Sequence, residues 1–172
     1  MQLRQNLYRR HHIVSRWLIT IGIILVIVIG VLIIFGKALS PARNAREKYE
    51  PIAAKVGLTE PSDFLVSKRN TVYYSVIGEN KKKQQIAVIM PAQKKPNPKA
   101  ATTVMLKDGL SYQQVVNRVW AEYKPKKVLS IGLTLYKGYP AWDVSFTNQK
   151  NNLNFVTLQF TDGKELKLIQ NL

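Results

Sequence analysis

The chain of 172 residues carries 26 Lys or Arg against 10 Asp or Glu, so its formal net charge is +16, and it has no Cys. The absence of Cys excludes disulfides, thiolate metal sites, Cys nucleophiles and lipid-anchoring thiols. Both His residues, His11 and His12, lie in the first dozen residues, which excludes zinc sites, Ser-His catalysis and His-based pH switches from the rest of the chain. The length allows one ordinary domain or two small ones.

Residues 17–36 are predicted to form a transmembrane helix. The stretch from Trp17 to Phe35 contains no charged residue, and at a rise of about 1.5 Å per residue it spans roughly 28 Å, close to the hydrocarbon thickness of about 30 Å. A helix in the core of a soluble domain needs a polar face, whereas this stretch is apolar on every side. We therefore expect Trp17–Phe35 to anchor the chain in the lipid bilayer.

Residues 1–16 are predicted to be a short cytoplasmic tail, because they contain four Arg residues and no acidic residue. The alternative is a cleaved signal peptide. However, the apolar run is longer than is usual for one, and Pro41 follows the best cleavage signature. We expect residues 37–172 to lie outside the cell, where the remaining 22 basic residues and all 10 acidic ones leave a net charge of +12. This location argues against nucleic acid as a partner.

Residues 37–108 are expected to form the first of two small units. A helix is predicted over residues 40–56, capped by Ser40, with one apolar face and a kink or break at Pro51. Strands are predicted to follow at residues 63–68, 72–77, 85–90 and 101–106.

Residues 109–172 are expected to form the second unit. Ser111 and Gln114 fit a capping box, so a helix is predicted to start there and to stop at Pro125. The pair Asp162-Gly163 predicts a hairpin turn, because Gly accepts a positive φ and Asp tolerates it. The strands of this unit are predicted at residues 128–136, 141–147, 153–160 and 166–169.

The two units are predicted to be a repeat. A shift of about 68 residues places Ile52 on Trp120, Tyr74 on Trp142, Val76 on Val144, Asn80 on Asn148 and Val88 on Val156. The predicted fold class is α+β, with one transmembrane helix followed by two units that each pack a helix on a short antiparallel sheet.

The second unit resembles the PepSY domain. The residues that carry the resemblance are the capped helix, the segment Ala141–Phe146 (AWDVSF) and the segment Asn154–Leu166 (NFVTLQFTDGKEL). In that family a helix precedes a W-x-V strand and a strand that ends in an Asp-Gly turn. The first unit departs from this pattern, since it lacks both the Trp and the Asp-Gly turn.

The order of a short tail, one span and two such PepSY/cystatin-like units makes the whole chain resemble the TseB/YpmB-like proteins of Gram-positive bacteria. Members of that family are described as cell-wall elongation regulators that associate with a penicillin-binding protein. The resemblance therefore implies a single-pass membrane protein with an extracellular domain and a wall-synthesis protein as its partner.

The residues predict no enzyme activity. The acidic residues are scattered singly, and no Ser-x-x-Lys, Gly-x-Ser-x-Gly or phosphate-cradling glycine motif occurs. Glu47 and Glu50 share a helix face, but neighbouring Arg and Lys residues make a solvated ion-pair cluster the better interpretation. We expect no catalytic residue, no metal site and no cofactor.

The candidate interaction residues are basic or aromatic. Lys81, Lys82 and Lys83 are predicted at a hairpin tip, and Lys94, Lys95 and Lys99 in a loop that contains Pro. Such lysines can simply keep loops solvated and prevent the edges of a β-sheet from pairing with another chain. Alternatively, they attract an anionic wall polymer or lipid headgroups. Tyr74, on a strand, and Tyr139, in a turn, are candidate anchors for a partner.

The leading interpretation is a non-catalytic, membrane-anchored regulator or adaptor of cell-wall elongation. It binds a penicillin-binding protein, or another wall-synthesis protein, through its extracellular domain. One alternative is a binding module for an anionic cell-envelope polymer, which the charge of +12 favours. Another is a peptidase inhibitor, which the PepSY resemblance implies.

Overall fold

The computed structural model describes residues 2–69 and 71–172, and in the first helix it describes side chains at residue 17, at residues 20–34 and from residue 41 onward. Contacts divide the chain into Met1–Asn44 and a compact unit, Ala45–Leu172. The side chains of the predicted cytoplasmic tail, residues 1–16, lie outside those described, as do four residues of the predicted span. Within the described residues, no helix meets the length and hydropathy that a membrane span requires.

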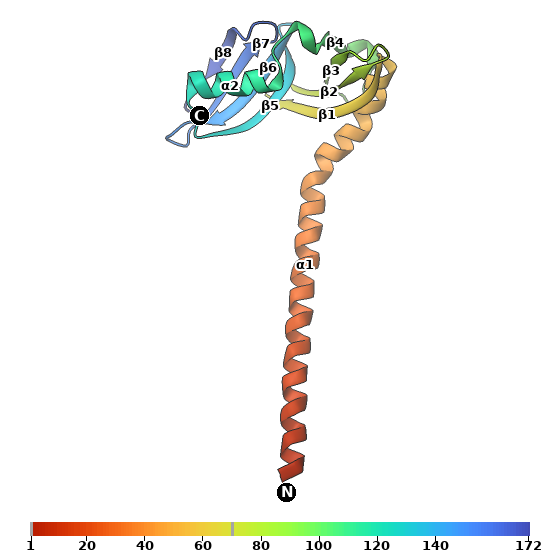
Figure 1. The fold of residues 1–172 in the computed structure, drawn as a ribbon, viewed down its shortest axis with the longest axis vertical. Coiled ribbons are helices and arrows are strands. Elements are labelled where there is room, and N and C mark those ends of the chain that lie inside the picture. The colour runs from red at the N-terminus through yellow and green to blue at the C-terminus, as the bar shows by residue number, and fades with distance from the viewer. Residues whose placement is uncertain (1, 70) are drawn as a thin grey trace. The chain divides into compact units, whose positions relative to one another are not determined.

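Helix α1 extends from Gln2 to Lys55 (Figure 1). The predicted helix start at Ser40 is therefore wrong, because Ser40 lies inside the helix, and of the kink or break predicted at Pro51 the break is excluded for the same reason. Proline removes one helical hydrogen bond, but Tyr49 and Ala53 on either side of Pro51 are buried in the compact unit. We attribute the continuity of the helix to this packing.

The compact unit contains two four-stranded antiparallel sheets, in which each strand pairs with the next one along the chain. The first sheet, sheet A, is packed against the end of α1, and the second, sheet B, is covered by helix α2 (Figure 1). The predicted α+β class is therefore confirmed. The strands of sheet A are β1 (Leu58–Lys68), β2 (Val72–Asn80), β3 (Gln85–Pro91) and β4 (Thr102–Met105). Those of sheet B are β5 (Lys127–Tyr136), β6 (Tyr139–Thr147), β7 (Leu153–Gln159) and β8 (Glu165–Ile169), and short 3-10 helices, η1 (Pro98–Ala100) and η2 (Leu106–Asp108), flank β4.

Helix α2 (Tyr112–Tyr123) begins and ends as its sequence predicts. The Ser111 hydroxyl accepts from Gln114 N, and the Gln114 side chain accepts from Ser111 N, which completes the capping box. Lys124 adopts the left-handed conformation and Pro125 follows it, so the helix cannot continue. Val115 and Val119 are its buried residues and point into sheet B.

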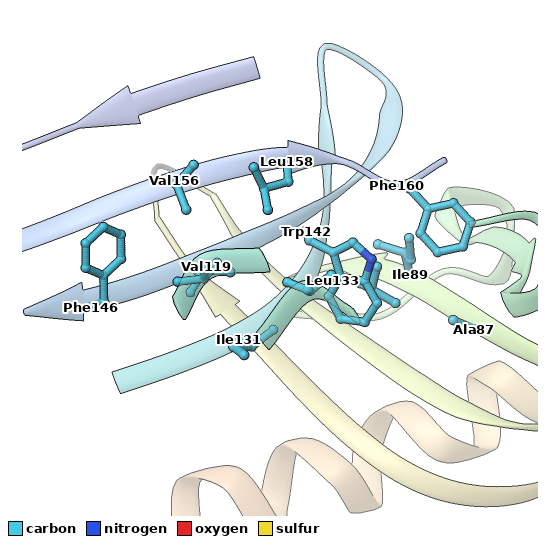
Figure 2. Packing of buried hydrophobic residues seen from close by; sticks show 12 residues of the cluster. Ala87, Ile89, Val119, Ile131, Leu133, Trp142, Phe146, Val156, Leu158 and Phe160 are labelled. Carbon is cyan, nitrogen blue, oxygen red and sulfur yellow. The ribbon is translucent and has the colours of Figure 1, made fainter. Parts of the chain in front are cut away.

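The main hydrophobic core is shared by the two sheets. Strand β3 is buried along its whole apolar run, with Ile86, Val88 and Met90 facing α1 while Ala87 and Ile89 face the other way. Figure 2 shows Ile89 next to Leu133 and Trp142 of sheet B and to Phe160, which follows β7, and Ala87 belongs to the same core cluster. A smaller core lies between α1 and sheet A.

The predicted repeat is visible in two equivalent turns. The Asn80 side chain accepts from Lys82 N and Gln84 N, and 68 residues later the Asn148 side chain accepts from Lys150 N and Asn152 N. The register agrees as well, because Val76 pairs with Val88 and Val144 pairs with Val156. The equivalence fails in the helices. Ile52 packs against the smaller core, whereas its counterpart Trp120 is 47% exposed.

Candidate functional site

An open groove of about 600 Å³ lies at one end of sheet B. We call it the tyrosine groove. Aromatic and apolar side chains form most of its wall, and they come from the β5–β6 turn, the end of β7 and the start of β8. Its lining residues are Tyr136, Lys137, Tyr139, Pro140, Gln159, Phe160, Thr161, Glu165 and Leu166.

The β5–β6 turn sets the position of the two tyrosines. Lys137 and Gly138 both have positive φ, 52° and 85°, as a type I′ hairpin turn requires. Tyr136 therefore pairs directly with Tyr139 across the turn. The Tyr139 side chain is 73% exposed, so this candidate residue offers a large aromatic surface at the rim of the groove.

Helix α2 fixes the β7–β8 turn, which contributes Thr161 to the wall of the groove. Gly163 has a φ of 72°, and a side chain there would collide with Leu110 and Arg118. Arg118 Nη1 donates to Asp162 O over 3.0 Å, and Lys164 N donates to the Asp162 carboxylate over 2.9 Å. The predicted Asp162-Gly163 hairpin is therefore correct, and the groove wall is tied to the helix.

The charges of the tyrosine groove are held in place by aromatic neighbours. Tyr123 on α2 donates its hydroxyl to Glu165 Oε2 over 2.6 Å. Burial and this carboxylate raise the pKa of Tyr123 above its ordinary value. The Lys137 ammonium lies 5.7 Å from the centre of the Tyr136 ring. The groove therefore combines a mostly apolar wall with one carboxylate and one ammonium, a mixture that is typical of ligand-binding clefts.

The described residues include no group of three or more His, Cys, Asp or Glu side chains that could hold a metal ion. The most buried ion pair instead joins the two sheets. Arg69 Nη1 lies 2.8 Å from Asp143 Oδ1, and each side chain is only 13% exposed. Ser67 Oγ donates to Asp143 Oδ2 over 2.8 Å, and Thr157 Oγ1 donates to Asp143 Oδ1 over 2.7 Å.

The lysine candidates fall into two separate loops. Lys81, Lys82 and Lys83 are exposed in the β2–β3 turn, where Lys83 Nζ lies 2.6 Å from Glu60 Oε1. Hydrogen bonding to the Glu60 carboxylate raises the pKa of Lys83. Lys94, Lys95 and Lys99 are exposed in the β3–β4 connection. A role of either loop in binding stays a prediction.

Tyr74 is the least accessible of the candidate residues. Its ring centre lies 4.6 Å from that of Tyr49 and 5.7 Å from that of Phe64, next to the smaller core. Tyr73, its neighbour, packs against the main core. Both rings are half-buried, and a role for Tyr74 in binding a partner stays a prediction.

Sequence reasoning missed most of the wall of the tyrosine groove and the buried ion pair. Asp143 is one of the singly scattered acidic residues, and nothing in its local sequence indicates a buried partner. No local pattern reveals Arg69, which lies 74 residues away in sequence. The sequence around Tyr136 and Phe160 indicates strands only. The groove forms because the ends of the β5–β6 and β7–β8 hairpins lie next to each other.

One comparison with known proteins matches a family model over part of the chain. Residues 52–91, which cover the end of α1 and strands β1 to β3, match the family model described as a cell wall elongation regulator TseB-like domain. A comparison with curated proteins gives no match.

Among solved structures, the YpmB protein from Bacillus subtilis is similar, with a TM-score of 0.59 and 24% identity. The match covers 72% of this chain and 98% of that one. A candidate lipoprotein from Clostridium difficile 630 gives a TM-score of 0.37 and 15% identity, over 74% of this chain and 88% of the other. The predicted resemblance to TseB/YpmB-like proteins is therefore confirmed, in sequence by the TseB-like match at residues 52–91 and in architecture by the YpmB-like fold.

Proposed function

We propose that the chain is a non-catalytic, membrane-anchored regulator of cell-wall elongation that binds a penicillin-binding protein through the tyrosine groove. The match to a cell wall elongation regulator domain is the observation that carries the class of function. The groove carries the proposed mode of action, because it presents the highly exposed Tyr139 beside an apolar hollow. Exposed aromatic residues next to apolar hollows are typical anchors of protein interfaces.

The proposed anchor is the apolar run Trp17–Phe35, with the N-terminus in the cytoplasm and residues 37–172 outside. The described large apolar side chains between Ile21 and Ile34 are 44–68% exposed. Exposing a continuous apolar surface of this kind to water is unfavourable, whereas a bilayer accommodates it.

We also propose that each sheet with its helix is a PepSY-like unit, and that the regulator acts by contact with its partner.

The groove is tested with a photo-crosslinking amino acid placed at Tyr139 of the full chain in intact Gram-positive cells. We expect a penicillin-binding protein among the captured products, identified by mass spectrometry. The same crosslinker at Trp120, which is exposed on α2 but does not line the groove, is the control. Capture of a wall-synthesis protein from Trp120 but not from Tyr139 would overturn the groove as the docking site.

Binding is then measured with the purified full chain in detergent and the captured penicillin-binding protein. Tyr139→Ala is expected to weaken binding by at least tenfold, as the truncation of an aromatic hot-spot residue costs about 2 kcal/mol or more. Trp120→Ala is expected to leave the affinity within twofold. Equal effects of the two substitutions would contradict the proposal.

A further inference from the structure

The connection between β3 and β4 is a strongly basic surface. We call residues 92–100 the basic loop. Lys94, Lys95 and Lys99 are exposed in it, and no acidic residue occurs between residues 92 and 107. In the part of the chain that the structure describes, no carboxylate forms an ion pair with these three lysines. Their charges are therefore available to a ligand.

The basic loop is held against α1 by hydrogen bonds that use none of its three ammonium groups. Tyr49 Oη accepts from Gln93 N over 2.7 Å. Lys48 Nζ donates to Gln93 O over 3.0 Å and to Lys94 O over 2.8 Å. The backbone of the loop is thus fixed at its start, on a buried tyrosine of the smaller core.

The far side of the loop is fixed by its own sequence. The Asn97 side chain accepts from Lys99 N over 2.9 Å and caps the short helix η1. Pro96 and Pro98 restrict the backbone on either side of Asn97. Because the loop is already ordered, a ligand that binds its lysines loses little free energy in ordering the backbone.

The lysines of the β2–β3 turn differ from those of the basic loop, because one of them has carboxylate partners. Lys83 in that turn lies 2.6 Å from Glu60 Oε1 and 3.6 Å from Glu79 Oε2. The two carboxylates partly neutralise the turn. The contrast makes the basic loop the stronger anion site, although both loops carry three lysines.

We propose that the basic loop binds a linear phosphodiester polymer of the cell wall. Exposed ammonium groups on a rigid backbone match a chain of regularly spaced phosphates in charge. A bilayer surface fits less well, because segments that bind anionic lipid use either clusters of about 4–8 basic residues or large apolar side chains beside the basic ones. The basic loop contains three lysines and no large apolar side chain. The basic loop is separate from the tyrosine groove, and its binding of a polymer does not depend on the partner proposed for the groove.

The test uses the full chain in neutral detergent micelles and a fluorescent poly(glycerol phosphate) of ten repeats. Binding is followed by anisotropy between 50 and 200 mM NaCl. Three phosphate contacts on a flexible phosphodiester chain predict a slope of about −2 in log affinity against log salt, which is a loss of roughly 20-fold over this range. The triple variant Lys94→Gln, Lys95→Gln and Lys99→Gln is expected to lose most of this slope.

The matched control removes the same number of exposed charges elsewhere, as Lys81→Gln, Lys82→Gln and Lys150→Gln, and is expected to keep the wild-type slope. Equal losses in the two triple variants would overturn the proposal in favour of net charge alone. Absence of polymer binding at 50 mM NaCl would also overturn it. So would loop-dependent binding to phosphatidylglycerol vesicles without polymer binding, which would assign the loop to lipid. Tyr139→Ala is expected to leave polymer binding unchanged, so the two proposals can fail separately.

Discussion

Arg69 and Asp143 form the charged contact that joins the two sheets. Arg69 Nη1 lies 2.8 Å from Asp143 Oδ1, and both side chains are largely buried. The hydroxyls of Ser67 and Thr157 donate the other hydrogen bonds to the Asp143 carboxylate. Burying one charge alone is far more costly than burying the pair. We therefore expect the free energy of unfolding to fall most when only one of the two charged residues is removed.

Asp143→Asn is predicted to lower the free energy of unfolding by about 3–5 kcal/mol, because it leaves the Arg69 guanidinium buried without a counter-charge. Arg69→Met together with Asp143→Leu is expected to recover most of this loss, since neither charge remains. Urea denaturation of the full chain in detergent measures both effects. A loss below 1 kcal/mol for Asp143→Asn would show that the pair behaves like an exposed one.

Tyr123 makes the stability of the folded protein depend on pH in the alkaline range. Burial, with the nearby Glu165 carboxylate, raises the pKa of its hydroxyl above the ordinary value of 10.0. The unfolded chain therefore loses this proton at lower pH than the folded one. The stability that it contributes is complete below pH 10 and declines as the pH rises above 10.

Tyr123→Phe is accordingly predicted to flatten the loss of stability above pH 10, while the wild type declines more steeply. The measurement is the urea midpoint of both proteins at half-unit steps from pH 8 to pH 11. Tyr112→Phe is the control, because it removes the same hydroxyl from a ring that lies on the same helix and is half exposed. Parallel pH profiles for wild type and Tyr123→Phe would contradict the assignment.

At the scale of the elements, the contact between β1 and β5 depends on a glycine. A Cβ at Gly132 would lie 2.8 Å from Val66 O and 2.9 Å from Ser67 N. Both of these are backbone atoms that cannot rotate away. Ser75 Oγ also donates to Leu133 O next to this point, over 3.2 Å. The two sheets approach each other here too closely for any residue larger than glycine to fit without a shift of the backbone.

Gly132→Ala is predicted to destabilise the protein by about 1–3 kcal/mol through overpacking. Hydrogen exchange should rise in β1 and β5 together. Ser111→Ala, which removes the α2 cap and costs about 1 kcal/mol, is the comparison, and it should raise exchange at the start of α2 instead. Unchanged exchange in β1 after Gly132→Ala would show that the strands do not depend on this close approach.

The elements that could be predicted from the sequence are those whose cause is local. The α2 cap depends on Ser111 and Gln114, three residues apart, and the two Asn turns depend on one side chain each. The continuation of α1 through Pro51 could not be predicted, because it depends on packing against sheet A. The same holds for the tyrosine groove, of which only Tyr139 was recognised, since its walls meet only after sheet B has formed.

At the scale of the whole molecule, the shared core predicts that the two sheets unfold together. Ala87 and Ile89 of sheet A are fully buried among residues of sheet B and α2. Neither sheet keeps a complete core when the other is lost. The sequence repeat suggests two independent units, but a core that crosses the boundary between them favours a single cooperative transition.

Ile89→Ala is predicted to lower the stability of both sheets by the same amount, about 2–5 kcal/mol, because the truncation leaves a cavity in the core that they share. The measurement is hydrogen exchange of the full chain in detergent across a urea series, comparing the amides of β2 with those of β6. Met90→Ala, which truncates a residue of the smaller core between α1 and sheet A, is the matched variant for the other face of β3. If β2 lost protection at a lower urea concentration than β6 in the wild type, the sheets would be separate folding units. The two units of the sequence repeat would then also unfold independently of each other.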